Sequence, residues 1–226
     1  MEEPPIIELD WEQQYRVISP ESPIINFFEN LVEPELREIL YEIESLTNDR
    51  LRDESGDISL VSSSDRIVVP GLNPIMGAFT HISKNCPSRF SNGSYGIYYA
   101  TRTLETAIEE TKFKRTKFLS FTNEEPGEIG MHVYIGGVAK PMHDIQGNQY
   151  KYLHDSYDWQ LSQKFGQSLK EADSWGIVYS SVRDLGGQCI AALRPPSITI
   201  PRSDIHLSYV WDGIGISNVY EKNLIQ

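Results

Sequence analysis

Three side chains in the stretch 88–114 have the types needed to bind a phosphorylated sugar that carries an aromatic ring. Arg89 precedes a turn of serine, asparagine and glycine, and a guanidinium beside such backbone N–H groups can clamp a phosphate. Tyr99 lies in the aromatic run YGIYYA, and its ring face can stack on another ring. Glu110 follows on an expected helix, where a carboxylate can stabilise a developing sugar cation. Together these residue types fit the handling of a dinucleotide.

Each of these residues also fits a purely structural role, and the residues alone do not decide between a structural and a functional role. Taken alone, Arg89 is better explained as a surface arginine before a hairpin, and Tyr95, Tyr98 and Tyr99 are more typical of core aromatics. Glu109 and Glu110 are adjacent on the expected helix, so they point about 100° apart and cannot serve one site equally. Glu110 lies on the flank of the apolar side of that helix, a position typical of a functional or a solvated carboxylate.

Two further polar residues, Ser181 and His81, follow apolar runs. Ser181 has no GxSxG context and no evident His/Asp partner, which favours a hydrogen-bonding role at a strand end over a nucleophile. His81 fits either a position near the site or a satisfied core histidine. The sequence has no P-loop, no GxGxxG and no His/Cys/Asp/Glu spacing typical of a metal site.

The elements that must position these residues alternate irregularly along the chain. Apolar spacing predicts an amphipathic helix over about 33–52, and Thr103 is the expected N-cap of a helix that carries Glu110. A helical region broken near Gly166 is expected over 150–172. Strands are expected at 95–100, 117–122, 130–142, 175–182 and 188–200. Because strands outnumber long helices, the pattern predicts an α+β fold rather than a doubly wound sheet.

The bulk composition excludes several classes of protein. A chain of 226 residues suits one domain, or one domain with an extension. Its net charge of -12 argues against a large nucleic-acid surface, although a local cationic pocket stays compatible with it. No apolar run approaches the roughly 20 residues of a membrane helix, and the acidic N-terminus lacks the pattern of a secretion signal. Two cysteines, Cys86 and Cys189, without metal-like spacing favour a reducing cytoplasm over a disulfide.

The ordered segments SRFSNGSYGIYYATRTLETAIEET and WGIVYSSVRDLGGQCIAALRPP resemble the RES-domain family, the toxins of bacterial RES–Xre toxin–antitoxin pairs. The resemblance extends over most of the chain and is most specific over about 76–197. It implies an ADP-ribosyltransferase-like core of short mixed or antiparallel sheets flanked by helices. Residues 1–75 are then a helical N-terminal extension packed on the core, and residues 76–226 form the RES domain as a single unit.

Carried over position by position, the resemblance assigns the family's arginine, tyrosine, glutamate and serine to Arg89, Tyr99, Glu110 and Ser181. It implies that Arg89 contacts the phosphates of NAD and that Tyr99 stacks on nicotinamide or its ribose. Glu110 stabilises the positive charge that develops on the ribose, and Ser181 positions the substrate or Glu110. We also expect His81 among the NAD-binding residues. The chain departs from the family at Ser180, where many relatives have proline.

The resemblance further implies an enzyme that consumes NAD as a substrate, with no resident cofactor and no metal. It cleaves the nicotinamide–ribose bond by hydrolysis or phosphorolysis, depletes cellular NAD, and is neutralised by an Xre-type antitoxin protein. A protein-directed ADP-ribosyltransferase, an exported NAD-degrading effector and a non-enzymatic binding module on the same fold are the alternatives. The expected setting is cytoplasmic, without direct contact to nucleic acid or membrane, and a homodimer within the toxin–antitoxin complex stays open.

Overall fold

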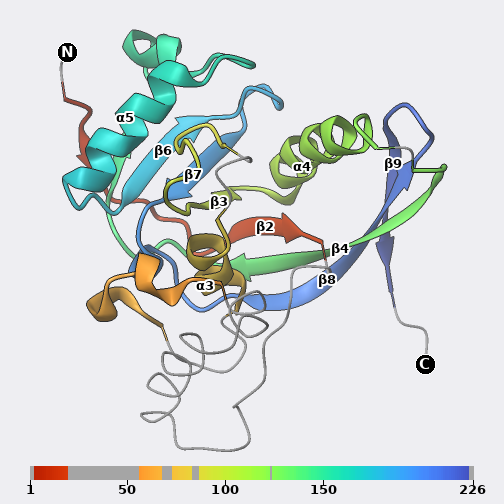
Figure 1. Ribbon diagram of the computed structural model, residues 1–226, viewed down its shortest axis with the longest axis horizontal. Helices are drawn as coiled ribbons and strands as arrows, with labels where there is room; N and C mark the ends of the chain where they lie inside the picture. The colour runs from red at the N-terminus through yellow and green to blue at the C-terminus, as the bar shows by residue number, and fades with distance from the viewer. Residues whose placement is uncertain (1–2, 20–55, 68–72, 83–86, 123, 224–226) are drawn as a thin grey trace, which may run out of the picture.

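A nine-stranded sheet runs through the part of the chain that the computed structural model describes, residues 3–19, 56–67, 73–82, 87–122 and 124–223 (Figure 1). Its order is β1-β5-β6-β7-β3-β2-β4-β8-β9, and all neighbouring strands are antiparallel except β5 and β6. The strands are β1 (Ile6–Ile7), β2 (Gln14–Ile18), β3 (Tyr98–Thr101), β4 (Gly127–Gly136), β5 (Met142–Asp144), β6 (Gly176–Ser180), β7 (Gln188–Ala192), β8 (Arg202–Trp211) and β9 (Ile216–Lys222).

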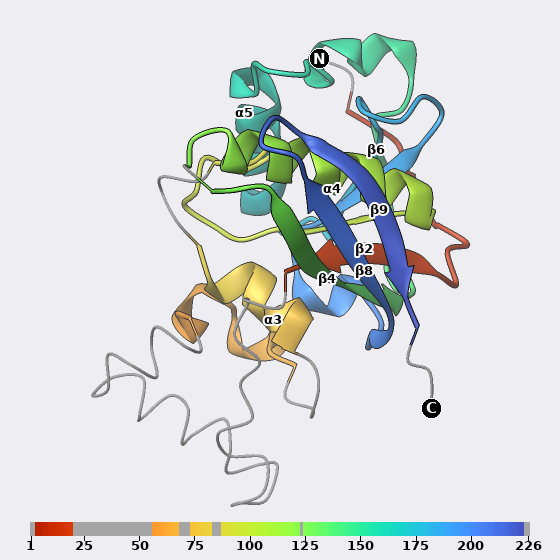
Figure 2. The ribbon, with the colours of Figure 1, turned by 90° about the vertical axis from the view of Figure 1, so that its right-hand side faces the viewer.

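Helices cover both faces of the sheet, and the predicted α+β class is confirmed (Figures 1 and 2). The α-helices are α3 (Asn73–Thr80), α4 (Leu104–Leu119) and α5 (Gln160–Glu171). Short 3-10 turns add η1 (Ile58–Leu60), η2 (Ser63–Asp65), η3 (Asn148–Leu153) and η4 (Pro195–Ser197). In both views α4 and α5 lie on one side of the sheet and α3 lies on the other.

The alternation of side chains along β3 and β7 separates two apolar layers. Tyr98 and Ile190 point toward α3, where they pack with Phe79. Cys189 and the ring of Tyr99 point to the opposite layer, which holds residues from η3 and α5. A third cluster lies between α4 and the strands β2, β4, β8 and β9. Because successive strand residues face opposite sides, only one of the two adjacent tyrosines can face the layer of α4 and α5.

Residues 1–75, expected as a helical extension packed on the core, contribute strands to the sheet itself. β2 lies between β3 and β4, and β1 forms one edge beside β5. The helix α3 spans the expected boundary between residues 75 and 76. The helix expected over 33–52 and one of the two cysteines, Cys86, lie outside the described residues. The other cysteine, Cys189, is a buried free thiol.

Two predictions of local structure were wrong. The segment 117–122, expected as a strand, forms the end of α4 and the turn that follows it, and Leu119, the last residue of the helix, is buried in the cluster beneath it. Six residues cannot separate a period of 2 from a period of 3.6 by apolar pattern alone. The helix α5 runs through Gly166 without a break. Glycine is required there because an added Cβ would collide with the backbone of Phe90, so the residue marks close packing of a loop on the helix.

Candidate active site

Tyr99 is held rigidly on the face of the sheet covered by α4 and α5. Its hydroxyl shares a hydrogen bond of 2.8 Å with Ser88 Oγ and accepts the backbone N–H of Phe90 at 3.1 Å. Burial raises the pKa of Tyr99 to about 12, with smaller opposing effects from these hydrogen bonds and from the charge of Arg89. The phenol therefore stays protonated at neutral pH. Tyr98, the neighbour that left the assignment open, points to the other face, where its hydroxyl accepts a hydrogen bond from Gln14.

Glu110 and Ser181 meet at the same place although 71 residues separate them. The hydroxyl of Ser181 donates to Glu110 Oε1 at 2.7 Å, and the thiol of Cys189 lies 3.9 Å from the same oxygen. Glu109 instead forms an ion pair of 2.9 Å with Lys112, and its side chain is 44% exposed. The helix thus separates the two adjacent carboxylates, and it is Glu110 that faces the sheet.

The start of α4 is tied to the loop that carries Ser181. Thr103 is the N-cap, as predicted, and its side chain accepts the N–H of Thr106. Thr106 Oγ1 in turn donates to Asp184 Oδ2 at 2.6 Å, which joins the first turn of the helix to the loop 181–187. Gly187 permits this contact, because an added Cβ would lie 2.7 Å from both Thr106 Cγ2 and Asp184 Oδ2. These contacts fix the distance between the loop and the helix.

Arg89 is only 8% exposed and anchors the loop that follows η3. Its Nη1 donates to the carbonyl oxygens of Leu153 at 3.4 Å and Asp155 at 2.8 Å. Its guanidinium carbon lies 5.9 Å from the ring centre of Trp159. The hydrogen bonds described for this side chain all leave from Nη1, so Nε and Nη2 keep N–H groups that an anion can use. A bound phosphate is compatible with this anchoring role.

Three further cationic side chains lie against aromatic rings in this region, and the sequence motifs did not identify them as site residues. Lys114 Nζ lies 5.0 Å from the ring centre of Tyr99, and Lys117 Nζ lies 5.6 Å from that of Trp159. Arg183 stacks 3.4 Å above the ring of Phe113. Its Nη2 donates to the carbonyl oxygen of Ser156 at 2.6 Å, which connects the loop 181–187 to the loop after η3. In a chain of net charge -12, this concentration of cations favours an anionic ligand.

His154 is another polar residue of this region that no motif in the sequence indicates. Its Nε2 accepts the backbone N–H of Ser180 at 3.3 Å, and its Nδ1 lies 3.1 Å from the carbonyl oxygen of Tyr150. Only a neutral ring with its proton on Nδ1 satisfies both contacts. Burial lowers the pKa of His154, the carbonyl of Tyr150 raises it, and the charge of Arg89 lowers it further. His154 therefore joins η3 to the strand end beside Ser181.

The structure does not bring His81 to this group of residues. His81 directly follows α3 and is exposed. The helix packs its Ile75 and Phe79 on the layer of Tyr98, the face of the sheet opposite Tyr99. Arg89, Tyr99, Glu110 and Ser181 thus share one region, whereas His81 lies across the sheet.

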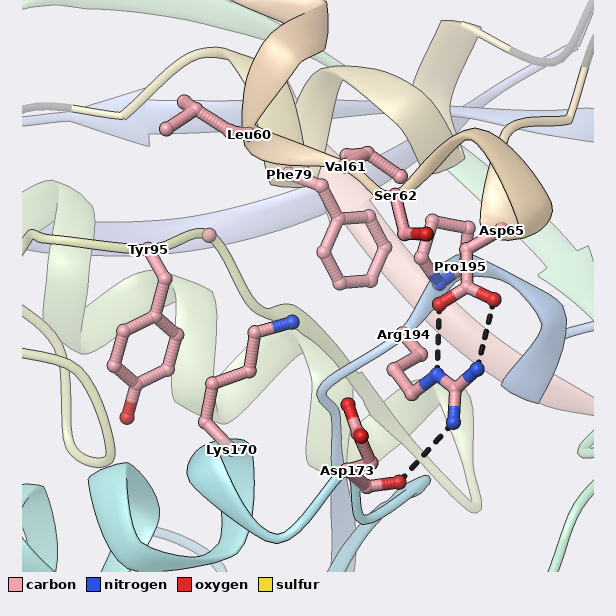
Figure 3. A pocket seen from close by; sticks show the side chains of 11 residues that line it. Leu60, Val61, Ser62, Asp65, Phe79, Tyr95, Lys170, Asp173, Arg194 and Pro195 are labelled. Carbon is pink, nitrogen blue, oxygen red and sulfur yellow. Dashed lines mark hydrogen bonds and ion pairs between the residues drawn. The ribbon is translucent and has the colours of Figure 1, made fainter.

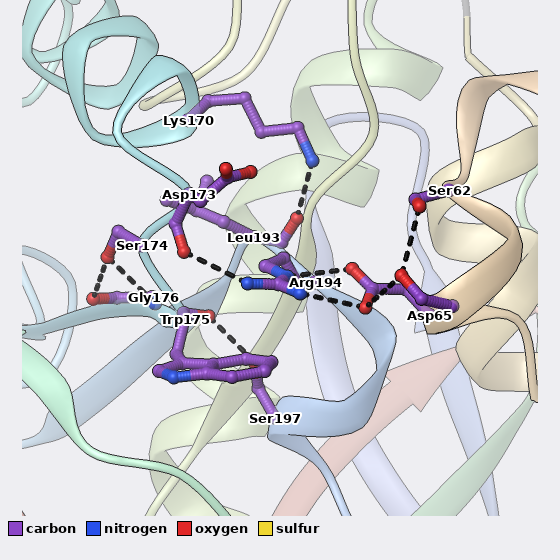
Figure 4. A network of polar contacts seen from close by, with 11 residues as sticks. Ser62, Asp65, Lys170, Asp173, Ser174, Trp175, Gly176, Leu193, Arg194 and Ser197 are labelled. Carbon is purple, nitrogen blue, oxygen red and sulfur yellow. Dashed lines mark hydrogen bonds and ion pairs between the residues drawn. The ribbon is translucent and has the colours of Figure 1, made fainter.

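A small pocket lies where η1 and η2 meet the core (Figure 3). It encloses about 410 Å³, part of it open to solvent, and Lys170 reaches into it between Tyr95 and Phe79. At its edge Arg194 donates to both carboxylate oxygens of Asp65, at 2.7 and 2.8 Å, and to the carbonyl oxygen of Asp173 at 3.2 Å (Figure 4). This polar cluster fastens the segment 56–67 to the rest of the domain.

Among the described residues no group of three or more histidine, cysteine, aspartate or glutamate side chains is arranged to hold a metal ion. In that same part of the chain, no helix is both long enough and apolar enough to cross a membrane.

Comparison with known proteins identifies the family. The model of the RES domain matches residues 65–212, so the chain belongs to the RES-domain family. An uncharacterized protein of Sinorhizobium fredii (strain NBRC 101917 / NGR234), y4oC, is 29% identical over 213 residues, 92% of this chain and 87% of that protein. The crystal structure of the M. tuberculosis MbcT–MbcA toxin–antitoxin complex aligns with a TM-score of 0.41 and 13% identity, covering 63% of this chain and 79% of that one.

Proposed function

We propose that the protein is a toxin that degrades NAD by cleaving its nicotinamide–ribose bond, through hydrolysis or phosphorolysis. The observation that carries the proposal is the 2.7 Å hydrogen bond from Ser181 to Glu110. This hydrogen bond holds the carboxylate of Glu110 on the same face of the sheet as the ring of Tyr99. The buried Arg89 lies close enough to Tyr99 for its charge to affect the pKa of the phenol. Membership of the RES-domain family supports the assignment.

In this proposal Arg89 binds the phosphates of NAD through the N–H groups that do not hold the loop after η3. Tyr99 offers its ring to nicotinamide or its ribose. The glycosidic bond between C1′ and the pyridine nitrogen breaks, and its electron pair leaves with neutral nicotinamide. Glu110 hydrogen-bonds the ribose hydroxyls and stabilises the positive charge left on C1′ and the ring oxygen. Water or phosphate then adds its oxygen to C1′ and releases a proton to solvent.

Ser181 acts through Glu110 in this scheme. Its single hydroxyl proton is given to the carboxylate, while its oxygen accepts the backbone N–H groups of Arg183 at 3.1 Å and Asp184 at 3.0 Å. A hydroxyl used in this way orients Glu110 and does not attack the substrate.

We further propose that an Xre-type antitoxin protein neutralises the toxin by covering this site. The exposed Tyr157, at 80%, and Leu185, at 104%, lie on the two loops that border it and offer apolar contacts to such a partner. Expression of the chain alone should then arrest growth and lower cellular NAD, and co-expression of the antitoxin should restore both.

The test is product analysis of NAD incubated with purified protein, with and without phosphate and with an acceptor lysate. Free ADP-ribose identifies hydrolysis, its phosphate ester identifies phosphorolysis, and labelled protein identifies ADP-ribosyl transfer instead. Glu110→Gln should remove most turnover while the protein stays folded, and Glu109→Gln should stay active because Glu109 faces Lys112. A folded and fully active Glu110→Gln protein would refute the role of this carboxylate.

A further inference from the structure

Lys114 stands one helical turn beyond Glu110 and shares its side of α4. Residues four apart on a helix lie on the same face. Lys114 is an exposed residue, and its ammonium lies 5.0 Å from the ring centre of Tyr99. Loss of hydration lowers the pKa of Lys114, and the negative charge of Glu110 opposes that shift. A carboxylate and an ammonium therefore border the same tyrosine ring.

The position of this ammonium is not explained by an ion pair within the described residues. The carboxylate of Glu110 is engaged by Ser181 and approached by Cys189. Lys112, two residues earlier on the helix, is paired with Glu109. Lys114 instead lies over the face of an aromatic ring, a cation–π interaction that a bound ring can replace.

We propose that Lys114 is a further catalytic residue, whose ammonium lies at the edge of bound nicotinamide and favours its departure. The inference rests on the proposed function. In NAD the nicotinamide ring carries the positive charge, and a neighbouring ammonium repels it. When the glycosidic bond breaks, its electron pair neutralises the ring and the positive charge moves to the ribose. Lys114 thus destabilises the positive charge on the nicotinamide ring before the bond breaks, and Glu110 stabilises the positive charge on the ribose as the bond breaks.

This arrangement acts on the difference between ground state and transition state, which is the difference that changes kcat. A ring that stacks on the face of Tyr99 now covered by Lys114 displaces the ammonium. The four-carbon side chain is flexible enough to keep its charge beside the bound ring. Removing the charge should therefore slow bond cleavage without weakening the binding of NAD.

The variant Lys114→Met removes the charge and keeps most of the apolar side chain. We expect kcat for nicotinamide release to fall about 10-fold, with KM for NAD unchanged or lowered, as follows when ground-state repulsion is relieved. Lys114→Arg should retain most turnover because it keeps the charge. Lys112→Met is the matched control, since it removes the same charge from the outer face of the same helix and should behave as wild type.

An NAD analogue whose pyridine is a better leaving group supplies the decisive readout. If Lys114 assists departure, the defect of Lys114→Met shrinks with this analogue, whereas a packing defect would be the same for both substrates. A wild-type rate for Lys114→Met, or a rise in KM at unchanged kcat, would overturn the inference; the second result would make Lys114 a phosphate ligand. If the wild-type protein releases no nicotinamide, the proposed function itself fails and the inference fails with it.

Discussion

The hydroxyl of Ser181 and the carboxylate of Glu110 form a 2.7 Å hydrogen bond that joins the loop after β6 to the middle of α4. The serine oxygen is also an acceptor for two backbone N–H groups of its own loop. The loop therefore fixes the position of the serine oxygen, and the hydroxyl proton of Ser181 points toward Glu110. The orientation of Glu110 is a property of the loop 181–187 as much as of the helix.

Ser181→Ala should consequently affect both activity and stability. We expect kcat to fall about 10-fold or more because the carboxylate loses its orienting donor. The free energy of unfolding should fall by about 1 kcal/mol because two loop N–H groups lose an acceptor. Kinetics with NAD and chemical denaturation measure the two effects. Ser180→Ala is the control, since the contact of Ser180 with His154 is made by its backbone, and comparable loss in both variants would contradict the role of Ser181.

Two adjacent glycines, Gly186 and Gly187, end the same loop, and alanine substitutions there test two different effects. At Gly186 alanine strains the backbone, whereas at Gly187 it pushes the loop away from α4. Gly186 has a φ of 86° with open space around it, whereas a Cβ at Gly187 would push against Thr106 and Asp184. Gly186→Ala should cost about 1 kcal/mol of stability and keep activity. Gly187→Ala should lower activity at least as strongly as Ser181→Ala, because it separates the loop from α4. Equal activity in the two alanine variants would show that the contact of Thr106 with Asp184 does not position the site.

The sequence predicts the helices and strands better than it predicts which of their side chains come into contact. Alternation along YGIYYA requires Tyr98 and Tyr99 to face opposite sides, but which side holds the site depends on the packing of α4. The spacing of Glu110, Lys114 and Lys117 at i, i+4 and i+7 contains a signal that could have been used. Such spacing normally indicates a solvated helix face. The tertiary fold places this face of α4 beside Tyr99.

The contacts of Arg89 cannot be predicted from the local sequence pattern. Its anchoring carbonyls lie 64 and 66 residues further along the chain, and no periodicity reports contacts at that distance. His81 is a similar case. The apolar run before the histidine does not indicate on which face of the sheet α3 packs, because that is decided by long-range contacts.

His154 should make the stability of the protein depend on pH near neutrality. Its folded-state pKa lies below the ordinary 6.5 because burial disfavours the charged ring. The unfolded chain therefore binds the proton first as pH falls, so stability declines below about pH 6.5 until the folded-state pKa is reached. His132 and His143 also have pKa values lowered first by burial and contribute to the same decline.

His154→Gln isolates the share of this residue. An amide can donate to Tyr150 and accept from Ser180, as the neutral ring does, but it does not titrate. The difference in unfolding free energy between wild type and this variant should be constant above pH 7 and should narrow, or reverse in favour of the variant, at pH 5. Denaturation curves collected across this range measure it. Parallel pH dependences of the two proteins would exclude His154 as a contributor.

The pair of Asp65 and Arg194 should be the strongest ionic contribution to stability among those described here. The side chains are 9% and 20% exposed, and the contact is bidentate, so it is screened less than a surface pair. Asp65→Asn should lower the free energy of unfolding by about 2–3 kcal/mol, since a hydrogen-bonded charge loses its partner in a partly buried place. Arg194→Gln should cost at least as much, because Arg194 also stacks 3.9 Å from the ring of Trp175.

A double-mutant cycle of Asp65→Asn and Arg194→Gln extracts the coupling between the two charges, which should be clearly favourable. The pKa of Asp65 is lowered from 3.8, first by the hydrogen bond from Arg194. The coupling should therefore be fully present above about pH 4 and be lost only as pH falls through the lowered pKa. The exposed pair of Lys222 and Glu128, 55% and 60% exposed, is the matched control and should show little coupling. A cycle at pH 7 that gave the same value for both pairs would mean that the segment 56–67 is held to the core by its apolar contacts alone.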